Sequence, residues 1–197
     1  MTLPNLFTLA RIAFSPLFFI FFFLGTWTGN NQLAYILVVW VLFILIELSD
    51  LLDGFLARKL KRTSELGKIL DPFADAVSRL TYFICFTGEG IMPLWVLLLI
   101  VYRDLGVAFA RQIAGGRGVI LGARLTGKIK AWVYAIAGIA GMLWMSVDFI
   151  TLSEEIIHIV NRMAGIVFIC CALIAVISLV DYLLSVFTNQ MEDNDRR

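Results

Sequence analysis

Six long apolar stretches, separated by short polar or glycine-containing breaks, divide the sequence from end to end. At about 1.5 Å per residue, each is roughly long enough to cross the ~30 Å hydrocarbon core of a bilayer as an α-helix. The predicted helices cover residues 5–25, 32–57, 67–87, 91–113, 127–149 and 155–187. This pattern predicts an all-α, polytopic membrane protein with six transmembrane helices, in which residues 1–197 form a single domain.

The first apolar stretch begins with LPNLFTLAR, which predicts a short amphipathic segment leading into the first transmembrane helix. Arg11 and Pro16 interrupt the stretch, and no cleavage site of small residues follows it. A secretory signal peptide would have an unbroken apolar run followed by such a site. We therefore expect this stretch to remain in the protein as a membrane helix.

The composition supports membrane insertion. Of the 197 residues, 60% are hydrophobic and only 16% are charged, whereas soluble domains are about half apolar and about one quarter charged. This amount of polar surface is too small to cover a globular protein in water. We therefore expect membrane lipid around the protein and no nucleic-acid partner. The three cysteines lie inside apolar runs without the spacing of a disulfide framework or a zinc site, and we interpret them as buried thiols.

Lysines and arginines are concentrated around alternate breaks, which predicts the orientation of the chain. The break after the second predicted helix and the region around the break after the fourth are rich in them, and Arg11 and the terminal Arg196–Arg197 fall on the same side. The breaks on the opposite side contain acidic residues but no lysine or arginine. Because basic residues remain on the cytoplasmic side of membranes, both termini are predicted to be cytoplasmic.

Four aspartates interrupt the apolar pattern near the cytoplasmic ends of the second and third predicted helices. Asp50 and Asp53 are three residues apart, and Asp71 and Asp75 are four apart, so each pair lies on one face of its helix. The short connection predicts an antiparallel hairpin that turns near residues 61–63. In such a hairpin the four carboxylates converge at one depth.

Four neighbouring carboxylates cannot all remain ionised in an apolar site without cations. Oxygen-only ligands point to two hard divalent cations, Mg²⁺ or Mn²⁺, which would suit a phosphoryl-type displacement. The alternative without a metal is that the acids form ion pairs with Arg58, Lys68 or Arg79. A second alternative is a cation-binding transporter, although transporter sites usually lie nearer the middle of the membrane.

The aspartates belong to a longer pattern of residues with fixed spacing. It reads Asp50-x-x-Asp53-Gly54-x-x-Ala57-Arg58 and, after eight further residues, Gly67-x-x-x-Asp71-x-x-x-Asp75. This pattern resembles the signature of the CDP-alcohol phosphotransferases, and the six-helix layout resembles theirs over nearly the whole chain. Members of that family transfer a phosphatidyl or similar group from a CDP-linked donor to an alcohol and release CMP.

The resemblance implies roles for the residues of the signature. The four aspartates would bind two metal ions, and Asp75 would also be the base that deprotonates the attacking hydroxyl. The CDP-donor site would be formed by Gly54, Ala57, Arg58, Ser64 and Gly67, where Ser64 could instead be the N-cap of the third helix.

Basic residues of the fourth and fifth predicted helices, Lys130 among them, approach the same cytoplasmic end. As a group, Arg103, Arg111, Arg124 and Lys128 are typical of a phosphate-binding pocket, which favours a phosphorylated acceptor alcohol. The alternative is that they only set the topology and contact anionic lipid headgroups.

Three further segments, PNLFTLARIAFSP, LDPFAD and YRDLGVAFAR…ARLTGKIKA, are similar to those of the bacterial phosphatidylglycerophosphate synthases within this family. The similarity implies that sn-glycerol 3-phosphate attacks CDP-diacylglycerol, in phospholipid biosynthesis at the bacterial cytoplasmic membrane, with the active site facing the cytoplasm. It also implies a homodimer and places Asn5 and Thr8 near the donor headgroup. The sequence departs from these enzymes in two places, since Ala76 replaces a common lysine and Tyr102-Arg103-Asp104 replaces a more usual Ala-Arg-Glu. Other acceptors, namely inositol phosphate, serine or a lipid alcohol, remain as alternatives.

Overall fold

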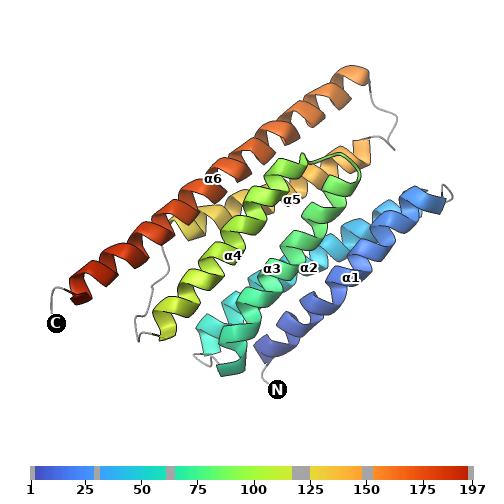
Figure 1. Ribbon diagram of the computed structural model, residues 1–197. Helices are drawn as coiled ribbons and strands as arrows, with labels where there is room; N and C mark the ends of the chain where they lie inside the picture. The colour runs from blue at the N-terminus through green and yellow to red at the C-terminus, as the bar shows by residue number, and fades with distance from the viewer. Residues whose placement is uncertain (1–2, 29–31, 61–64, 117–124, 148–152, 195–197) are drawn as a thin grey trace.

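The computed structural model describes residues 3–28, 32–60, 65–116, 125–147 and 153–194, and these ranges contain α-helices and no strand. The helices, shown in Figure 1, are α1 (Leu3–Thr28), α2 (Gln32–Leu60), α3 (Glu65–Gly88), α4 (Leu94–Gly116), α5 (Leu125–Val147) and α6 (Glu154–Asn194). The all-α prediction is confirmed for this part of the chain. Each predicted helix coincides with an observed one to within a few residues, except that α6 continues further towards the carboxyl end.

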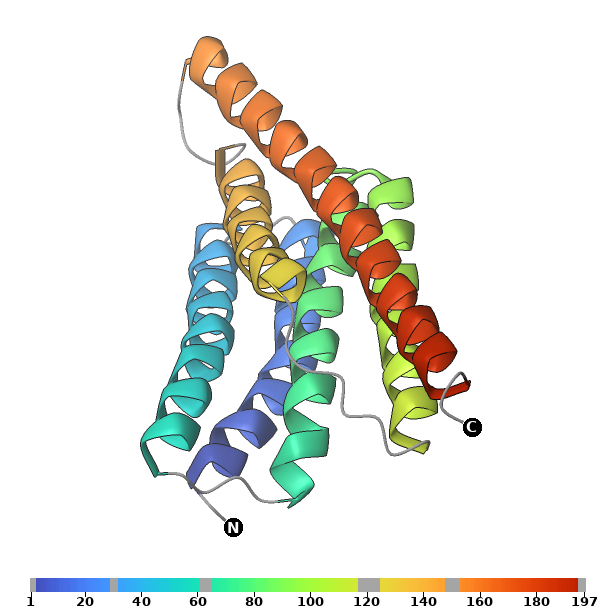
Figure 2. The ribbon, with the colours of Figure 1, turned by 90° about the vertical axis from the view of Figure 1, so that its left-hand side faces the viewer.

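Successive helices run in opposite directions and form a bundle (Figures 1 and 2). As a result, the first residues of α1, α3 and α5 lie at the same end as the last residues of α2, α4 and α6. The extensive contacts are between α1 and α2, α1 and α3, α5 and α6, and α4 and α6. All the motif residues therefore fall towards one end of the bundle.

The predicted hairpin of the second and third helices differs from the observed packing. Within the described residues, α2 and α3 make little direct contact, because α1 packs against both of them and lies between them. The predicted turn near residues 61–63 lies outside the described part of the chain. Hydropathy could predict where the helices are but not which of them are neighbours.

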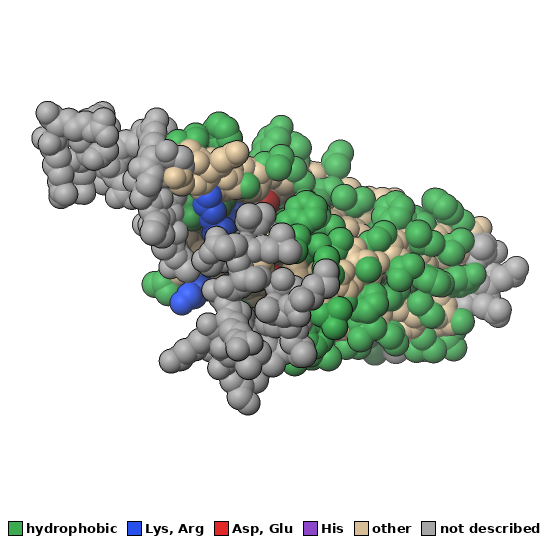
Figure 3. Space-filling model, turned by 90° about the horizontal axis from the view of Figure 1, so that it is seen from below, with side chains coloured by type: hydrophobic (Ala, Val, Ile, Leu, Met, Phe, Trp, Pro, Cys, Tyr) green, Lys and Arg blue, Asp and Glu red, His purple; other side chains and the backbone are tan. Residues whose placement is uncertain are grey.

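Four of the described helical segments are long and apolar enough to cross a membrane. They are Leu6–Gly25, Leu33–Leu52, Leu125–Val147 and Glu154–Ser185. The helices α3 and α4 are interrupted by charged residues, among them Asp71, Asp75 and Arg103. Hydrophobic side chains cover most of the face seen in Figure 3, and Lys and Arg side chains gather near one end of it. This outer surface is that of a membrane protein.

The interior of the bundle is built around aromatic rings. The Tyr82 ring meets Phe43 edge to face at 5.5 Å and Phe83 at 4.7 Å between ring centroids, and Phe83 meets Tyr134 at 5.7 Å. These rings connect α2, α3 and α5 below the polar end of the bundle. Gly141 of α5 allows close packing here, because a Cβ atom at this position would lie 2.3 Å from the ring of Phe86. The rigid aromatic core holds the helices that carry the polar residues.

Candidate active site

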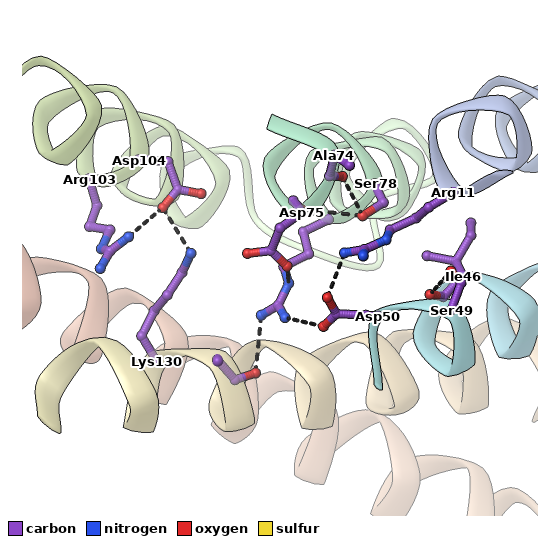
Figure 4. A network of polar contacts seen from close by, with 12 residues as sticks. Arg11, Ile46, Ser49, Asp50, Ala74, Asp75, Ser78, Arg103, Asp104 and Lys130 are labelled. Atoms are coloured by element: carbon purple, nitrogen blue, oxygen red, sulfur yellow. Dashed lines mark hydrogen bonds and ion pairs between the residues drawn. The ribbon is translucent and has the colours of Figure 1, made fainter. Parts of the chain in front are cut away.

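Three motif carboxylates are described, and two of them meet at one guanidinium. Asp50 comes from α2, and Asp71 and Asp75 from α3. Arg79 approaches Oδ1 of Asp75 with Nε at 2.6 Å and Oδ2 of Asp50 with Nη2 at 3.4 Å. Figure 4 shows Asp50 and Asp75 pointing towards one another. Their side chains are 34% and 35% exposed, so both remain accessible at the surface of the site.

Helix α1 supplies partners to two of these carboxylates. Thr8 donates a hydrogen bond from Oγ1 to Oδ1 of Asp71, with an oxygen–oxygen distance of 2.8 Å. Arg11 forms an ion pair with Oδ1 of Asp50 although it is itself completely buried. The position of α1 between α2 and α3 makes both contacts possible.

The ion-pair alternative is observed in part, because Arg79 does pair with Asp75. Arg58 and Lys68, the other two candidate partners, have side chains outside the described part of the structure. Both oxygens of Asp50 are engaged, Oδ1 by Arg11 and Oδ2 by Arg79, whereas the contacts to Asp75 and Asp71 involve Oδ1 of each. Arginines of the protein therefore offset part of the negative charge of these carboxylates.

The candidate metal ligands suit a hard divalent cation, since they are oxygen atoms of partly exposed carboxylates. Among the described residues, no three His, Cys, Asp or Glu side chains are grouped as a metal site. Asp53, the fourth carboxylate of the motif, has a side chain outside the described residues. The chemistry of the ligands fits Mg²⁺ or Mn²⁺, while their grouping around an ion stays a prediction.

Most predicted donor-binding residues also fall outside the described side chains. Gly54, Ala57 and Arg58 lie in α2 and Asn5 lies in α1, without described side-chain surroundings, and Ser64 lies outside the described chain altogether. Gly67 is buried in the first turns of α3. Their roles stay predictions.

A cavity of about 370 Å³ opens beside Asp75, between α3, α4, α5 and α6. Its wall contains two carboxylates, of which Asp75 belongs to the motif, and several basic or hydroxyl side chains; these polar residues are Asp75, Asp104, Arg103, Arg111, Lys128, Lys130 and Tyr182. The structure thus brings three of the four basic residues predicted to bind phosphate to one cavity with Asp75. The fourth, Arg124, lies outside the described residues.

The basic residues of the cavity differ in what holds them. Arg103 is buried and donates to Oδ1 of Asp104 at 2.9 Å and, from Nε and Nη2, to Ser178 at 3.2 and 2.9 Å. Its guanidinium thus contacts protein groups while it also lines the cavity, and its predicted role in binding phosphate stays a prediction. Arg111 is exposed; its Nε donates to the hydroxyl of Tyr182 at 2.9 Å, and its guanidinium lies 5.5 Å from the centroid of the Tyr182 ring.

Lys130 adds a further cation to this wall. Its Nζ donates to Oδ1 of Asp104 at 2.9 Å and lies 4.4 Å from the centroid of the Tyr134 ring. Figure 4 shows Lys130 and Asp104 on the side of Asp75 away from Asp50. An anionic ligand in the cavity would therefore meet Arg111, Lys128 and Lys130 within reach of the Asp75 carboxylate.

Comparison with known proteins identifies the family. The sequence model described as CDP-alcohol phosphatidyltransferase matches residues 1–187 of the chain. The chain belongs to this family.

Several curated relatives of this CDP-alcohol phosphatidyltransferase are bacterial. A CDP-diacylglycerol–glycerol-3-phosphate 3-phosphatidyltransferase of Treponema pallidum (strain Nichols) is 30% identical over 194 residues, which cover 95% of this chain and 90% of the relative. The enzyme of the same name from Bacillus subtilis (strain 168) is 35% identical over 141 residues, covering 68% of this chain and 73% of the relative. A CMP-forming cardiolipin synthase of Streptomyces coelicolor is 36% identical over 104 residues, covering 53% of this chain and 47% of the relative.

Sequence reasoning missed the contribution of α6 to this family member's cavity. Ser178 and Tyr182 hold Arg103 and Arg111, and Asp181 accepts a hydrogen bond from Thr126 of α5 at 2.7 Å. Asp181 and Tyr182 follow Ser178 by three and four positions, which places them on the same side of the helix as Ser178. A polar face within a long apolar helix was the signal that could have revealed them.

Proposed function

We propose that this CDP-alcohol phosphatidyltransferase transfers the phosphatidyl group of CDP-diacylglycerol to sn-glycerol 3-phosphate and releases CMP, as a step of phospholipid biosynthesis. The observation that carries the proposal is the cavity in which Asp75 faces Arg111, Lys128 and Lys130. It combines a carboxylate of the family motif with a cationic surface suited to a phosphorylated acceptor. The names of the relatives from Treponema pallidum and Bacillus subtilis support the choice of acceptor.

The donor site of this proposal is formed by the carboxylates and their surroundings. Asp50, Asp53, Asp71 and Asp75 hold two divalent cations, Mg²⁺ or Mn²⁺, which supply positive charge for the diphosphate when bound. The CDP group contacts the remaining motif positions, Gly54, Ala57, Arg58 and Gly67, together with Ser64 and Asn5. The acyl chains stay in the membrane beside the bundle.

The reacting groups meet at Asp75. The phosphate of the acceptor binds Arg111, Lys128 and Lys130, which directs its hydroxyl towards the carboxylate. Asp75 accepts the hydroxyl proton while the acceptor oxygen forms a bond to the phosphorus that bears diacylglycerol. The bond between that phosphorus and the oxygen of CMP breaks, and CMP leaves. Because acceptor and base are held in one cavity, the proton transfer takes place between groups that are already positioned, and the entropic cost of a bimolecular encounter is avoided.

The proposal includes an arrangement in the membrane. All six helices cross the bilayer, both termini and the cavity lie on the cytoplasmic side, and two copies of the chain associate. The apolar surface of the bundle and the basic residues at its motif-bearing end support the first two points. The dimer rests on the family resemblance alone.

The test is CMP release by the purified protein with CDP-diacylglycerol and either Mg²⁺ or Mn²⁺. The acceptors sn-glycerol 3-phosphate, inositol phosphate, serine and phosphatidylglycerol are supplied separately, and the products are identified by mass spectrometry. Release with glycerol 3-phosphate and formation of phosphatidylglycerophosphate are expected. Release only with another acceptor would replace the acceptor and keep the chemistry. Absence of release with every acceptor, from folded protein, would reject the enzyme and favour a cation transporter.

A further inference from the structure

Arg79 is engaged by three different helices. From α3 it contacts Asp75 of the same helix with Nε at 2.6 Å, Asp50 of α2 with Nη2 at 3.4 Å, and the carbonyl oxygen of Ala131 in α5 with Nη1 at 3.1 Å. All three guanidinium nitrogens therefore have protein partners. The charge cannot move away from the carboxylates without breaking these contacts.

The side chain of Arg79 is also removed from water, since only 7% of it is exposed. A buried guanidinium requires nearby acceptors, because its desolvation is costly. Asp75 and Asp50 provide them, and Glu47, one turn before Asp50 on α2, adds a further electrostatic interaction. Burial keeps most solvent away from the guanidinium, so its charge is screened less than that of a surface arginine.

We propose that Arg79 is a fixed counter-cation of the carboxylate cluster, which weakens the binding of divalent cations and strengthens the binding of the diphosphate group of the donor. This inference rests on the proposed function, because it takes the metal and the CDP-linked donor from there. It assigns to Arg79 a role that the CDP-alcohol phosphatidyltransferase motif does not contain, since the motif ends at Asp75.

The sign of each effect follows from Coulomb's law. A positive charge within a few ångströms of the carboxylates repels an arriving cation and attracts an arriving anion. Removing the charge therefore tightens metal binding and loosens diphosphate binding. A residue that only maintained the structure would change both affinities in the same direction, because a distorted site binds both ligands less well.

Two substitutions at this position separate charge from geometry. Arg79→Gln removes the charge and keeps a hydrogen-bond donor. Arg79→Lys keeps the charge and loses the planar guanidinium whose three nitrogens contact three partners. The affinity for Mn²⁺ is measured by isothermal titration calorimetry on the full chain in detergent, without substrate. We expect the Kd of Mn²⁺ to fall about tenfold in Arg79→Gln, an effect of the size of one partly screened charge, and to stay within about twofold in Arg79→Lys.

The second measurement is the Kd of CDP, used as a soluble probe, in the presence of saturating Mn²⁺. It is expected to rise about tenfold in Arg79→Gln, opposite in direction to the change for the metal. Arg162→Gln is the matched control, because Arg162 is an exposed arginine of α6 and its removal should change neither Kd. Weaker binding of both ligands in Arg79→Gln, or equal behaviour of the Gln and Lys variants, would overturn the inference.

If neither Arg79 variant folds, Ala76→Lys provides the test. Ala76 lines the cavity next to Asp75 and lies on the same face of α3 as Arg79, three residues before it. An added cation here should raise the Kd of Mn²⁺, and an unchanged Kd would reject control by charge. A wild-type protein that binds no Mn²⁺ would refute the metal site of the proposed function, and the inference with it. Mn²⁺ binding that is identical in wild type and Arg79→Gln would refute the inference alone.

Discussion

At the scale of single residues, Asp75 lies between the ion pair with Arg79 and the cavity with the basic side chains. One of its oxygens receives Arg79, and its side chain also forms part of the wall of the cavity with the basic residues. A carboxylate held on one side and open on the other is suited to accept a proton from a bound hydroxyl. The geometry assigns it a more direct part than Asp50, which lies on the side away from the cavity.

Asp75→Asn is expected to lower kcat for CMP release by about 10²–10⁴-fold, because the amide cannot accept the proton that the carboxylate accepts. The variant should still fold, with a lowered melting temperature in detergent, because the amide oxygen can accept from Arg79 and Arg79 keeps Asp50 and Ala131 as partners. Turnover within about twofold of wild type would show that another group acts as the base.

Arg111 and Arg103 are expected to respond differently to the same substitution. Arg111→Gln should raise the KM for glycerol 3-phosphate by at least about tenfold through the loss of a charge-assisted contact to phosphate, with the melting temperature preserved because Arg111 is exposed. Steady-state kinetics at saturating donor provide the measurement.

Arg103→Gln is expected to act mainly on stability. It removes the buried charge-assisted hydrogen bonds to Ser178 and Asp104 and leaves Asp104 paired with Lys130 alone, at a cost of about 1–3 kcal/mol. Thermal unfolding followed by circular dichroism measures this loss. A rise in KM for Arg103→Gln equal to that for Arg111→Gln, with no loss of stability, would contradict the distinction between them.

At the scale of helices, the arrangement of α1 was the main feature that the sequence could not predict. Apolar periodicity and the aspartate spacing identified the six helices and the residues of the motif, because both are local properties of the chain. The insertion of α1 between α2 and α3 depends on how whole surfaces fit together. Arg11 was therefore read as a marker of orientation, although a single arginine in an apolar run indicates a buried partner.

Close packing between α3 and α5 gives a test at this scale. Gly141→Ala is expected to destabilise the protein by about 1–3 kcal/mol, because the added Cβ would meet the buried ring of Phe86, which has no room to move. Gly165→Ala on α6 is the matched control, since nothing lies within 4 Å of a Cβ at that position. Melting temperatures of the two variants in the same detergent decide the matter, and equal values would contradict the packing.

At the scale of the whole molecule, composition predicted a membrane protein, and the apolar outer surface agrees with it. The cavity was only partly predictable. The basic residues of α4 and α5 were recognisable as a group, but their division into exposed and internally bonded side chains depends on Asp104, Ser178 and Tyr182, which tertiary packing brings together. No local pattern joins residues of α4 to residues of α6 more than seventy positions away.

The orientation in the membrane can be tested with two exposed positions at opposite ends of the bundle, Gly115 in α4 and Glu154 in α6. In a variant lacking the three native cysteines, Gly115→Cys should react with an impermeant maleimide only in inside-out vesicles, and Glu154→Cys only in right-side-out vesicles. This follows from the basic residues around the end of α4. The reverse pattern would place the cavity on the outer side.

The ion pair between Arg11 and Asp50 also has a consequence for how the chain is inserted into the membrane during its synthesis. The ribosome completes α1 and α2 before α3, so Arg11 and Asp50 can neutralise one another before Arg79 has been synthesised. Two opposite charges that enter the lipid together cost less than either charge alone. The α1–α2 pair can therefore enter the membrane with Asp50 already neutralised by Arg11. The later helices, which carry the rest of the site, then pack against this pair.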